Sequence, residues 1–310
     1  MKAILFPGQG SQLVGMGSEF YENFEIVKKI FKESDEILNF KISDIILKGP
    51  NDQLKLTKNT QPAILIVSYS IFSVLKQEFN FKEGDVKYFA GHSLGEYSAL
   101  LCSESLNFKD SLQLLYERGK SMQEAVPVGQ GGMLAILGSE ISEVDDLIKN
   151  LSVEGVCEIA NDNAQGQIIV SGNIKCIQAL QEILKENKKK SIPLPVSAPF
   201  HCSLMKPAAE TMKEKINKVN FKKPKFKIIT NVKAEPTQNP NEIKTLLYEQ
   251  IYSKVRWRES ILYMAKNGIN QFIEIGPGKV LTGLTKRILP KTNFFCINSI
   301  SDIKSVINGS

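Results

Sequence analysis

The residues with the clearest capacity for chemistry lie at one tight turn, Gly91-His92-Ser93-Leu94-Gly95. The apolar run Tyr88-Phe89-Ala90 precedes this turn, and helix-forming residues follow it. A serine between two glycines, where a strand turns into a helix, is typical of a nucleophile elbow, which exposes the hydroxyl above a helix N-terminus. The pattern therefore predicts Ser93 as a nucleophile. The alternative is a chance match in a loop, because the motif is short.

A serine nucleophile needs a proton acceptor, and the chain contains only two histidines, His92 and His201. His92 adjoins the serine, so its side chain should point away and serve to fix the loop. His201 follows Pro199-Phe200 in a loop, where side chains are often presented to a site, and we predict it as the base. Cys202 is disfavoured as a nucleophile because adjacent residues rarely present both groups to one point.

Two further features could assist this chemistry. A short apolar strand over 2–6 leads into the glycine-rich turn Pro7-Gly8-Gln9-Gly10, whose backbone N–H groups could bind an anion. The turn lacks the spacing of a dinucleotide site or of a P-loop, so an ordinary tight turn is the alternative. Arg118 lies in a predicted helix over 111–124, and a guanidinium binds a carboxylate through two parallel hydrogen bonds. Without further information, a solvated arginine on a helix face is the commoner case.

The composition is that of an ordinary globular protein, with 310 residues, 42% hydrophobic and 23% charged. A net charge of +6 does not call for nucleic acid but would suit an acidic partner or an anionic substrate. The five scattered cysteines lack CxxC spacing, so neither a disulfide framework nor a zinc site is predicted. No stretch indicates a signal peptide or a membrane span, and we expect a cytoplasmic protein that does not contact the membrane.

The order of predicted elements favours an α/β fold with a parallel sheet, because strands alternate with helices over most of the chain. Apolar residues at helical spacing predict helices over 25–38 and 42–47. A further helix is predicted over 59–78, with Pro62 in its first turn. These helices are expected to cover a core and carry no predicted function.

A break in this alternation predicts a second unit. Glycines over 127–132 interrupt the pattern, and the residues after them are predicted to run strand, helix, strand, strand, helix, strand. This βαββαβ order is ferredoxin-like. We therefore expect residues 1–126 and 200–310 to form a large α/β core and residues 127–199 to form an inserted small subdomain. His201 would then meet Ser93 at the seam between the two.

Five motifs, in order along nearly the whole chain, together resemble those of malonyl-CoA:acyl carrier protein transacylases, bacterial-type enzymes of fatty acid synthesis. They are Phe6-Pro7-Gly8-Gln9-Gly10-Ser11-Gln12, Gly91-His92-Ser93-Leu94-Gly95-Glu96-Tyr97, Pro199-Phe200-His201, Gln250 with Val255-Arg256-Trp257, and Glu274-Ile275-Gly276-Pro277-Gly278. The resemblance implies a hydrolase-like parallel-sheet core. It implies ping-pong transfer of malonyl from malonyl-CoA to the phosphopantetheine thiol of an acidic acyl carrier protein, without a metal or bound cofactor. We expect a monomer.

The resemblance also implies roles for individual residues. Ser93 would take the malonyl group as an ester, and His201 would be the base. The side-chain carbonyl of Gln250 would hold the other nitrogen of the histidine, where a hydrolase would use a carboxylate. The backbone N–H groups of Gln9 and Leu94 would form the oxyanion hole.

Three further residues are expected to contact or approach the substrate. The resemblance implies that Arg118 clamps the free carboxylate of malonyl. In related polyketide synthase domains, phenylalanine before the catalytic histidine accompanies malonyl, and Phe200 would crowd a 2-methyl group. Asn161 matches a small-subdomain asparagine near the site.

Two other classes of function compete with this interpretation. An α/β-hydrolase would order its triad as serine, acid, histidine, with the histidine near the chain end, whereas His201 lies mid-chain and the match after it is a glutamine. A non-catalytic binding module that keeps the fold is disfavoured because Ser93, His201, Gln250 and Arg118 are all present.

Overall fold

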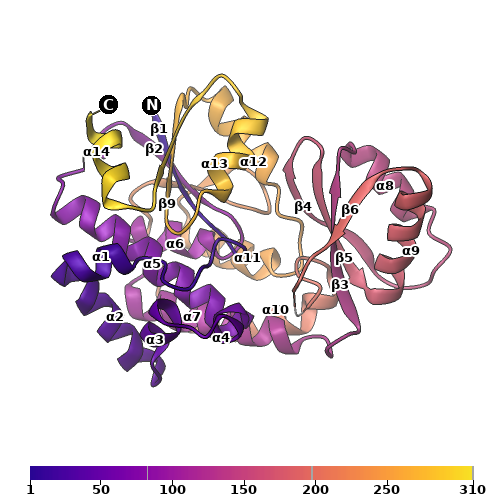
Figure 1. Ribbon diagram of the computed structural model, residues 1–310, viewed down its shortest axis with the longest axis horizontal. Coiled ribbons are helices and arrows are strands. Elements are labelled where there is room, and N and C mark those ends of the chain that lie inside the picture. Colours follow the sequence, from indigo (N-terminus) through magenta and orange to yellow (C-terminus); the bar gives the residue numbers. More distant parts are fainter. Residues whose placement is uncertain (82, 197, 309–310) are drawn as a thin grey trace.

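Two sheets organise the chain, one in a large unit and one in a smaller unit beside it (Figure 1). The computed structural model describes residues 1–81, 83–196 and 198–308. The large unit contains a six-stranded sheet of order β10-β9-β1-β2-β7-β8, parallel except for the edge strand β8. Its strands are β1 (Lys2–Phe6), β2 (Val86–Gly91), β7 (Lys227–Ile229), β8 (Pro236–Thr237), β9 (Gln271–Ile275) and β10 (Asn293–Ile297). The expected parallel sheet is confirmed.

Both faces of this sheet are buried, and the alternation of side chains along β1 shows how. Ile4 and Phe6 join the apolar cluster on one face, and Ala3 and Leu5 join the cluster on the other face. The helices that cover the two faces and fill the connections are α1 (Ser18–Asn23), α2 (Glu25–Leu38), α3 (Ile42–Leu47), α4 (Asn51–Lys55), α5 (Thr57–Gln77), α6 (Gly95–Cys102), α7 (Phe108–Glu124), η1 (Ser203–Met205), α10 (Lys206–Lys218), α11 (Pro240–Gln250), α12 (Trp257–Lys266), α13 (Val280–Ile288) and α14 (Ile300–Asn308).

The smaller unit is an antiparallel four-stranded sheet of order β4-β5-β3-β6 with two helices packed on it. Its elements are β3 (Gly131–Leu137), α8 (Ile141–Lys149), β4 (Cys157–Ala164), β5 (Gln167–Asn173), α9 (Ile174–Glu186) and β6 (Lys190–Pro193). Leu134 and Ile136 of β3 pack in the core of this unit, whereas Met133 and Ala135 pack against the large unit. The sheet therefore shares one apolar face with its own helices and the other with the large unit.

Strand β4 also crosses the seam between the units through its backbone. Asn161 forms a parallel bridge with Val255. The Val255 N–H donates to the Ala160 carbonyl at 2.8 Å, and the Asp162 N–H donates to the Val255 carbonyl at 3.0 Å. Arg258 closes the contact with an ion pair to the buried Asp162 at 2.9 Å.

The predicted helices over 25–38 and 42–47 are confirmed as α2 and α3, but other elements differ from expectation. Helix α5 begins at Thr57, so Pro62 lies inside the helix and not in its first turn. The helices α1 and α4, of 6 and 5 residues, were not predicted, because each buries a single apolar residue and so shows no apolar period. The edge strand β8 and the terminal helix α14 were also missed.

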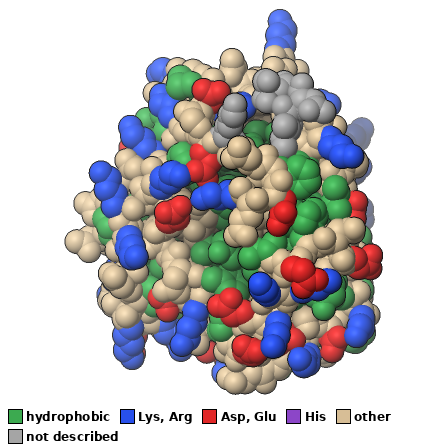
Figure 2. All heavy atoms as spheres, turned by 90° about the vertical axis from the view of Figure 1, so that its left-hand side faces the viewer, with side chains coloured by type: hydrophobic (Ala, Val, Ile, Leu, Met, Phe, Trp, Pro, Cys, Tyr) green, Lys and Arg blue, Asp and Glu red, His purple; other side chains and the backbone are tan. Residues whose placement is uncertain are grey.

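Charge is spread over the surface. Figure 2 shows the face on the left-hand side of Figure 1, where lysine, arginine, aspartate and glutamate side chains surround an area in which hydrophobic side chains gather. Within the described ranges, no helix combines the length and apolar character needed to cross a membrane.

Candidate active site

The predicted turn at Ser93 forms a strained connection between β2 and α6. Ser93 adopts a left-handed backbone conformation, with φ of 52°. A Cβ on Gly91 would lie 1.9 Å from the Gly95 carbonyl, and one on Gly95 would lie 2.3 Å from the Phe6 oxygen. Because neither position has room for a side chain, the two glycines allow the turn to close and lift the serine to its apex.

His201 lies against this serine. Its Nε2 is 2.8 Å from Ser93 Oγ, and its Nδ1 is 2.8 Å from the main-chain oxygen of Gln250. A peptide oxygen only accepts hydrogen bonds, so the proton of the neutral ring is on Nδ1 and Nε2 accepts from the serine hydroxyl. The expectation that the side-chain carbonyl of Gln250 holds this nitrogen is wrong, because the main-chain carbonyl does so.

The side chain of Gln250 instead forms hydrogen bonds around the Ser93 turn. Its Oε1 accepts from Arg118 Nη2 at 2.9 Å. Its Nε2 donates to the Ser93 carbonyl at 3.1 Å and to Glu96 Oε2 at 2.8 Å. The amide thus connects the nucleophile turn to the arginine.

Arg118 is fully buried, so it is not a solvated arginine on a helix face. Besides Gln250, its guanidinium donates to Gln61 Oε1 at 2.8 Å and to Ser93 Oγ at 3.2 Å. It also stacks over the Tyr97 ring at 5.8 Å. Among the described residues, these hydrogen-bond partners are all neutral, and Arg118 Nε has none. Burial lowers the pKa of Arg118, which the nearby Tyr97 and Glu96 oppose.

Burial also sets the protonation state of the histidine. It lowers the pKa of His201 to about 3, an effect that the charge of Arg118 increases and the Gln250 carbonyl opposes. The ring is therefore neutral near pH 7 and free to accept a proton from Ser93.

Two backbone N–H groups lie where an oxyanion hole would form. The turn after β1 packs against the elbow so closely that a Cβ on Gly8 would lie 2.5 Å from the His92 oxygen. This contact brings Gln9 beside the elbow, while Leu94 stands at the N-terminal end of α6. Within the described part of the chain, the N–H groups of Gln9 and Leu94 have no hydrogen-bond acceptor. They are available to an anionic oxygen.

The site opens into a cavity of about 290 Å³ at the seam between the two units. The small unit contributes Met133, Asn161 and Ile169 to its wall. Phe200 lines the cavity beside His201. His92 also lines it, and its Nε2 is held by Asn163 Oδ1 at 2.8 Å, in keeping with a loop-fixing role.

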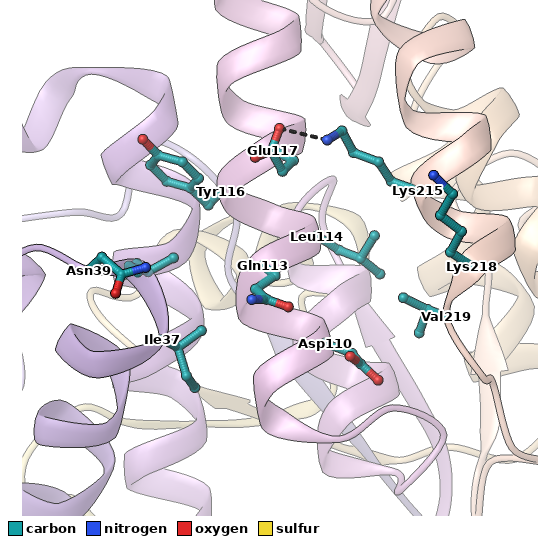
Figure 3. Close-up of a pocket in the computed structure, with 11 residues that line it drawn as sticks. Ile37, Asn39, Asp110, Gln113, Leu114, Tyr116, Glu117, Lys215, Lys218 and Val219 are labelled. Carbon is teal, nitrogen blue, oxygen red and sulfur yellow. Dashed lines mark ion pairs between the residues drawn. The ribbon is translucent and has the colours of Figure 1, made fainter.

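A larger groove, of about 460 Å³, lies elsewhere on the surface (Figure 3). It runs along the outer face of α7, where Glu117 pairs with Lys215 of α10 at 3.0 Å. Arg118, the next residue along α7, is fully buried and does not line this groove. The groove contains none of the residues that surround Ser93.

Sequence reasoning missed Asn231, which supports the turn that carries Ser93. Its Oδ1 accepts the Ser93 N–H at 2.7 Å, and its Nδ2 donates to the Gly91 carbonyl at 2.7 Å. Asn231 follows β7, and β7 pairs in parallel with β2. Because the carboxyl ends of parallel strands meet at one edge of a sheet, polar residues just after such strands are the signal that could have found it.

Two other supporting residues were also missed. Gln61, in the second turn of α5, accepts a hydrogen bond from the guanidinium of Arg118. Glu96 belongs to the elbow motif, but no role was predicted for it. Its carboxylate accepts from the Asn231 N–H at 3.0 Å, and burial raises its pKa to about 7 although these donors oppose the shift.

Comparison with known proteins identifies the family. The acyl transferase domain family matches residues 4–304. The malonyl CoA-acyl carrier protein transacylase of Bacillus subtilis is 43% identical over 309 residues, which are 98% of this chain and 96% of that protein. The chain belongs to this family of acyltransferases.

Other members agree in sequence and structure. The transacylase of Escherichia coli K12 is 37% identical over 306 residues, 98% of each chain. The acyl-carrier-protein S-malonyltransferase of Bartonella henselae superposes with a TM-score of 0.96 at 42% identity, covering 99% of this chain and 98% of that one. A malonyl-transacylase solved in complex with a type II PKS acyl-carrier protein gives a TM-score of 0.96 at 36% identity, covering 100% and 99%.

In this acyltransferase the groups around Ser93 are the imidazole of His201, the guanidinium of Arg118 and two backbone N–H groups that have no acceptor among the described residues. Over the described ranges, no cluster of three or more histidine, cysteine, aspartate or glutamate side chains could hold a metal ion.

Proposed function

We propose that this chain transfers malonyl from malonyl-CoA to the phosphopantetheine thiol of an acyl carrier protein, through a malonyl ester on Ser93. The observation that carries the proposal is the buried cation of Arg118, which touches Ser93 Oγ at 3.2 Å and bonds only to neutral partners among the described residues. A buried charge without an ion-pair partner is costly. The carboxylate of a malonyl group on Ser93 would supply that partner.

The first half-reaction acylates the serine. Ser93 Oγ attacks the thioester carbonyl as His201 Nε2 takes its proton, and the N–H groups of Gln9 and Leu94 stabilise the tetrahedral oxyanion. Collapse breaks the C–S bond, and the imidazolium returns its proton to the departing CoA thiolate. The main-chain carbonyl of Gln250 orients the ring throughout.

The second half-reaction is the reverse with a different thiol. His201 takes the proton of the phosphopantetheine thiol, whose sulfur attacks the ester carbonyl in the same oxyanion hole. The C–O bond to Ser93 breaks, and the imidazolium protonates the serine oxygen. CoA must leave before the carrier binds, so the kinetics would be ping-pong.

The wall of the cavity supports a preference among acyl groups. Arg118 favours an acyl chain that ends in a carboxylate, because a neutral acetyl group would leave the guanidinium without its partner. Phe200 would crowd a 2-methyl substituent, and Asn161 would line the path of the acyl chain. Malonyl therefore fits better than its α-substituted forms.

The proposal extends to the architecture and the setting. We classify the large unit, residues 1–126 and 200–310, as a hydrolase-like core and residues 127–199 as a ferredoxin-like insert. The order of β3, α8, β4, β5, α9 and β6 supports the second assignment. A net charge of +6 supports an acidic carrier protein as the partner. The proposed enzyme acts as a cytoplasmic monomer without a bound cofactor.

The intact mass of the purified protein after brief mixing with malonyl-CoA tests this function, with the S93A variant as control. We expect a malonyl adduct on the wild type only, and its loss when phosphopantetheinylated carrier protein is added. An adduct that decays equally fast without the carrier would point to a hydrolase. No adduct on the wild type would refute the proposal.

A further inference from the structure

A carboxylate of the small unit holds the chain just after the histidine. Glu158 Oε2 accepts the backbone N–H of Ser203 at 2.9 Å, and Glu158 Oε1 accepts the Ser203 hydroxyl at 2.5 Å. Both carboxylate oxygens are thus committed to one residue. Hydrogen bonds to a charged acceptor are stronger than those between neutral groups, so this is a firm attachment.

This attachment lies close to His201 and joins its loop to the small unit. Ser203 is the first residue of η1, two residues after His201, and η1 continues directly into α10. Glu158 lies on β4, where it pairs with Ser171 of β5 inside the antiparallel sheet. The carboxylate therefore ties the histidine loop to a regular strand of the other unit.

Strand β4 also holds the segment that follows Gln250, whose main-chain carbonyl accepts a hydrogen bond from His201. Two residues beyond Glu158, Ala160 accepts the Val255 N–H at 2.8 Å. Val255 lies five residues after Gln250, whose carbonyl holds His201 Nδ1. One strand thus anchors both the loop that carries the imidazole and the segment that carries its hydrogen-bond acceptor.

The backbone conformation of His201 is one that the surrounding structure has to enforce. His201 has a φ of 59°, in the left-handed region that a residue with a Cβ seldom occupies. Conformations of this kind cost free energy and persist only when the surrounding structure enforces them. Without a tether on its C-terminal side, the loop could relax and lengthen the contact between Nε2 and Ser93 Oγ.

We propose that Glu158 is a positioning residue for the transfer reaction, which acts through Ser203 to hold His201 against Ser93. The inference rests on the proposed function for its reaction but concerns a residue that makes no contact with the cavity. Glu158 supports the base, so its loss should slow acylation at saturating substrate and leave malonyl-CoA binding intact.

The test compares E158A, E158Q, S203A and the double variant E158A/S203A with wild type. The exposed Glu154, near the start of the same strand, gives the matched control E154A. For each protein we would measure kcat and KM for malonyl transfer, the rate at which a fluorophosphonate labels Ser93, and the thermal unfolding midpoint. The labelling rate reports the serine and histidine pair without malonyl-CoA, so it remains informative if the proposed substrate is wrong.

We expect E158A to lower kcat and the labelling rate about tenfold with KM unchanged, since small misplacements of catalytic groups are costly. E158Q, which keeps an acceptor for Ser203, should recover most of this loss. The double variant should be no slower than E158A, because E158A alone already removes both hydrogen bonds to Ser203. Unchanged kcat and labelling in folded E158A would overturn the proposal. If E158A does not fold, S203A replaces it as the test, because it removes the shorter of the two hydrogen bonds to Glu158. Unchanged rates in S203A would then overturn the proposal, and reduced rates would support it.

Discussion

The imidazole of His201 has an unusual electrostatic setting. Its Nδ1 faces a peptide carbonyl, which stabilises an imidazolium less than a carboxylate would. The cation of Arg118 opposes protonation further. A malonyl carboxylate bound to Arg118 would cancel that repulsion, so the proposed substrate would itself make His201 a stronger base. An acetyl group could not do so.

This setting predicts the pH dependence of the free enzyme. Because the pKa of His201 is lowered to about 3, fluorophosphonate labelling of Ser93 should stay constant from about pH 8 to about pH 6, where an ordinary histidine would titrate. In that region the native state binds fewer protons than the unfolded state. The free energy of unfolding should therefore fall as the pH drops below about 6.5, and H201Q should reduce this fall. A labelling rate that halves near pH 6.5 would contradict the prediction.

The carboxylate clamp proposed for Arg118 can be tested by its removal. R118A should lower kcat/KM for malonyl-CoA about 100-fold, through loss of a charge-assisted bidentate contact. Transfer of acetyl from acetyl-CoA should be equal to wild type or faster. The control K215A removes a cation from the groove on the outer face of α7 and should change neither rate. Equal losses with both acyl groups would assign Arg118 a structural role only.

At the scale of elements, the site is an edge at which three parallel strands end. The turn after β1 brings Gln9, the elbow after β2 brings Ser93, and Asn231 follows β7. Neighbouring parallel strands deliver these residues to one line without any long loop. The buried glycines of the elbow permit the close approach of the β1 turn.

Those glycines give a prediction about stability. G91A should destabilise the protein by about 3 kcal/mol or more, because its Cβ would lie 1.9 Å from the Gly95 backbone. The control is G283A in α13, where no atom lies within 4 Å of an added Cβ. There, alanine should stabilise the helix by up to about 1 kcal/mol. Chemical denaturation of both variants measures the two changes, and similar values would contradict the steric argument.

The sequence predicts features that depend on neighbouring residues better than features that depend on residues far apart in the chain. The elbow and the helices α2 and α3 follow from local motifs and apolar period, so they could be predicted residue by residue. The role of Gln250 could not, because nothing in an amino-acid type tells whether its main chain or its side chain faces the histidine. Asn231 and Glu158 act on residues more than 40 positions away, and only the pairing of strands brings them there.

The proposed active site lies at the seam between two units with separate sheets, so the whole molecule contributes to it. The large unit supplies Ser93, His201 and Phe200 to the cavity wall, and the small unit supplies Met133, Asn161 and Ile169. Strand β4 joins the units through Glu158, through the backbone at Val255 and through Asp162. Any shift of this strand would alter both the wall of the cavity and the support of the histidine.

Removal of the ion pair between Asp162 and Arg258 would show how much this contact across the seam adds to the free energy of unfolding. Burial raises the pKa of Asp162, and Arg258 opposes the shift at 2.9 Å. R258A would leave a buried carboxylate without its partner, so the free energy of unfolding should fall by about 3 kcal/mol near pH 7. The loss should shrink as the pH falls, because Asp162 can then take up a proton in the folded variant.

The control for this prediction is K149A, which breaks an exposed ion pair with Asp145 on α8 and should cost less than about 0.5 kcal/mol. Denaturant unfolding at several pH values measures both variants. If R258A costs the same at every pH, the lost contact is packing rather than charge. The stability of the seam would then come from the apolar face that β3 and β5 share with the large unit. In that case the position of the cavity wall would not depend on pH.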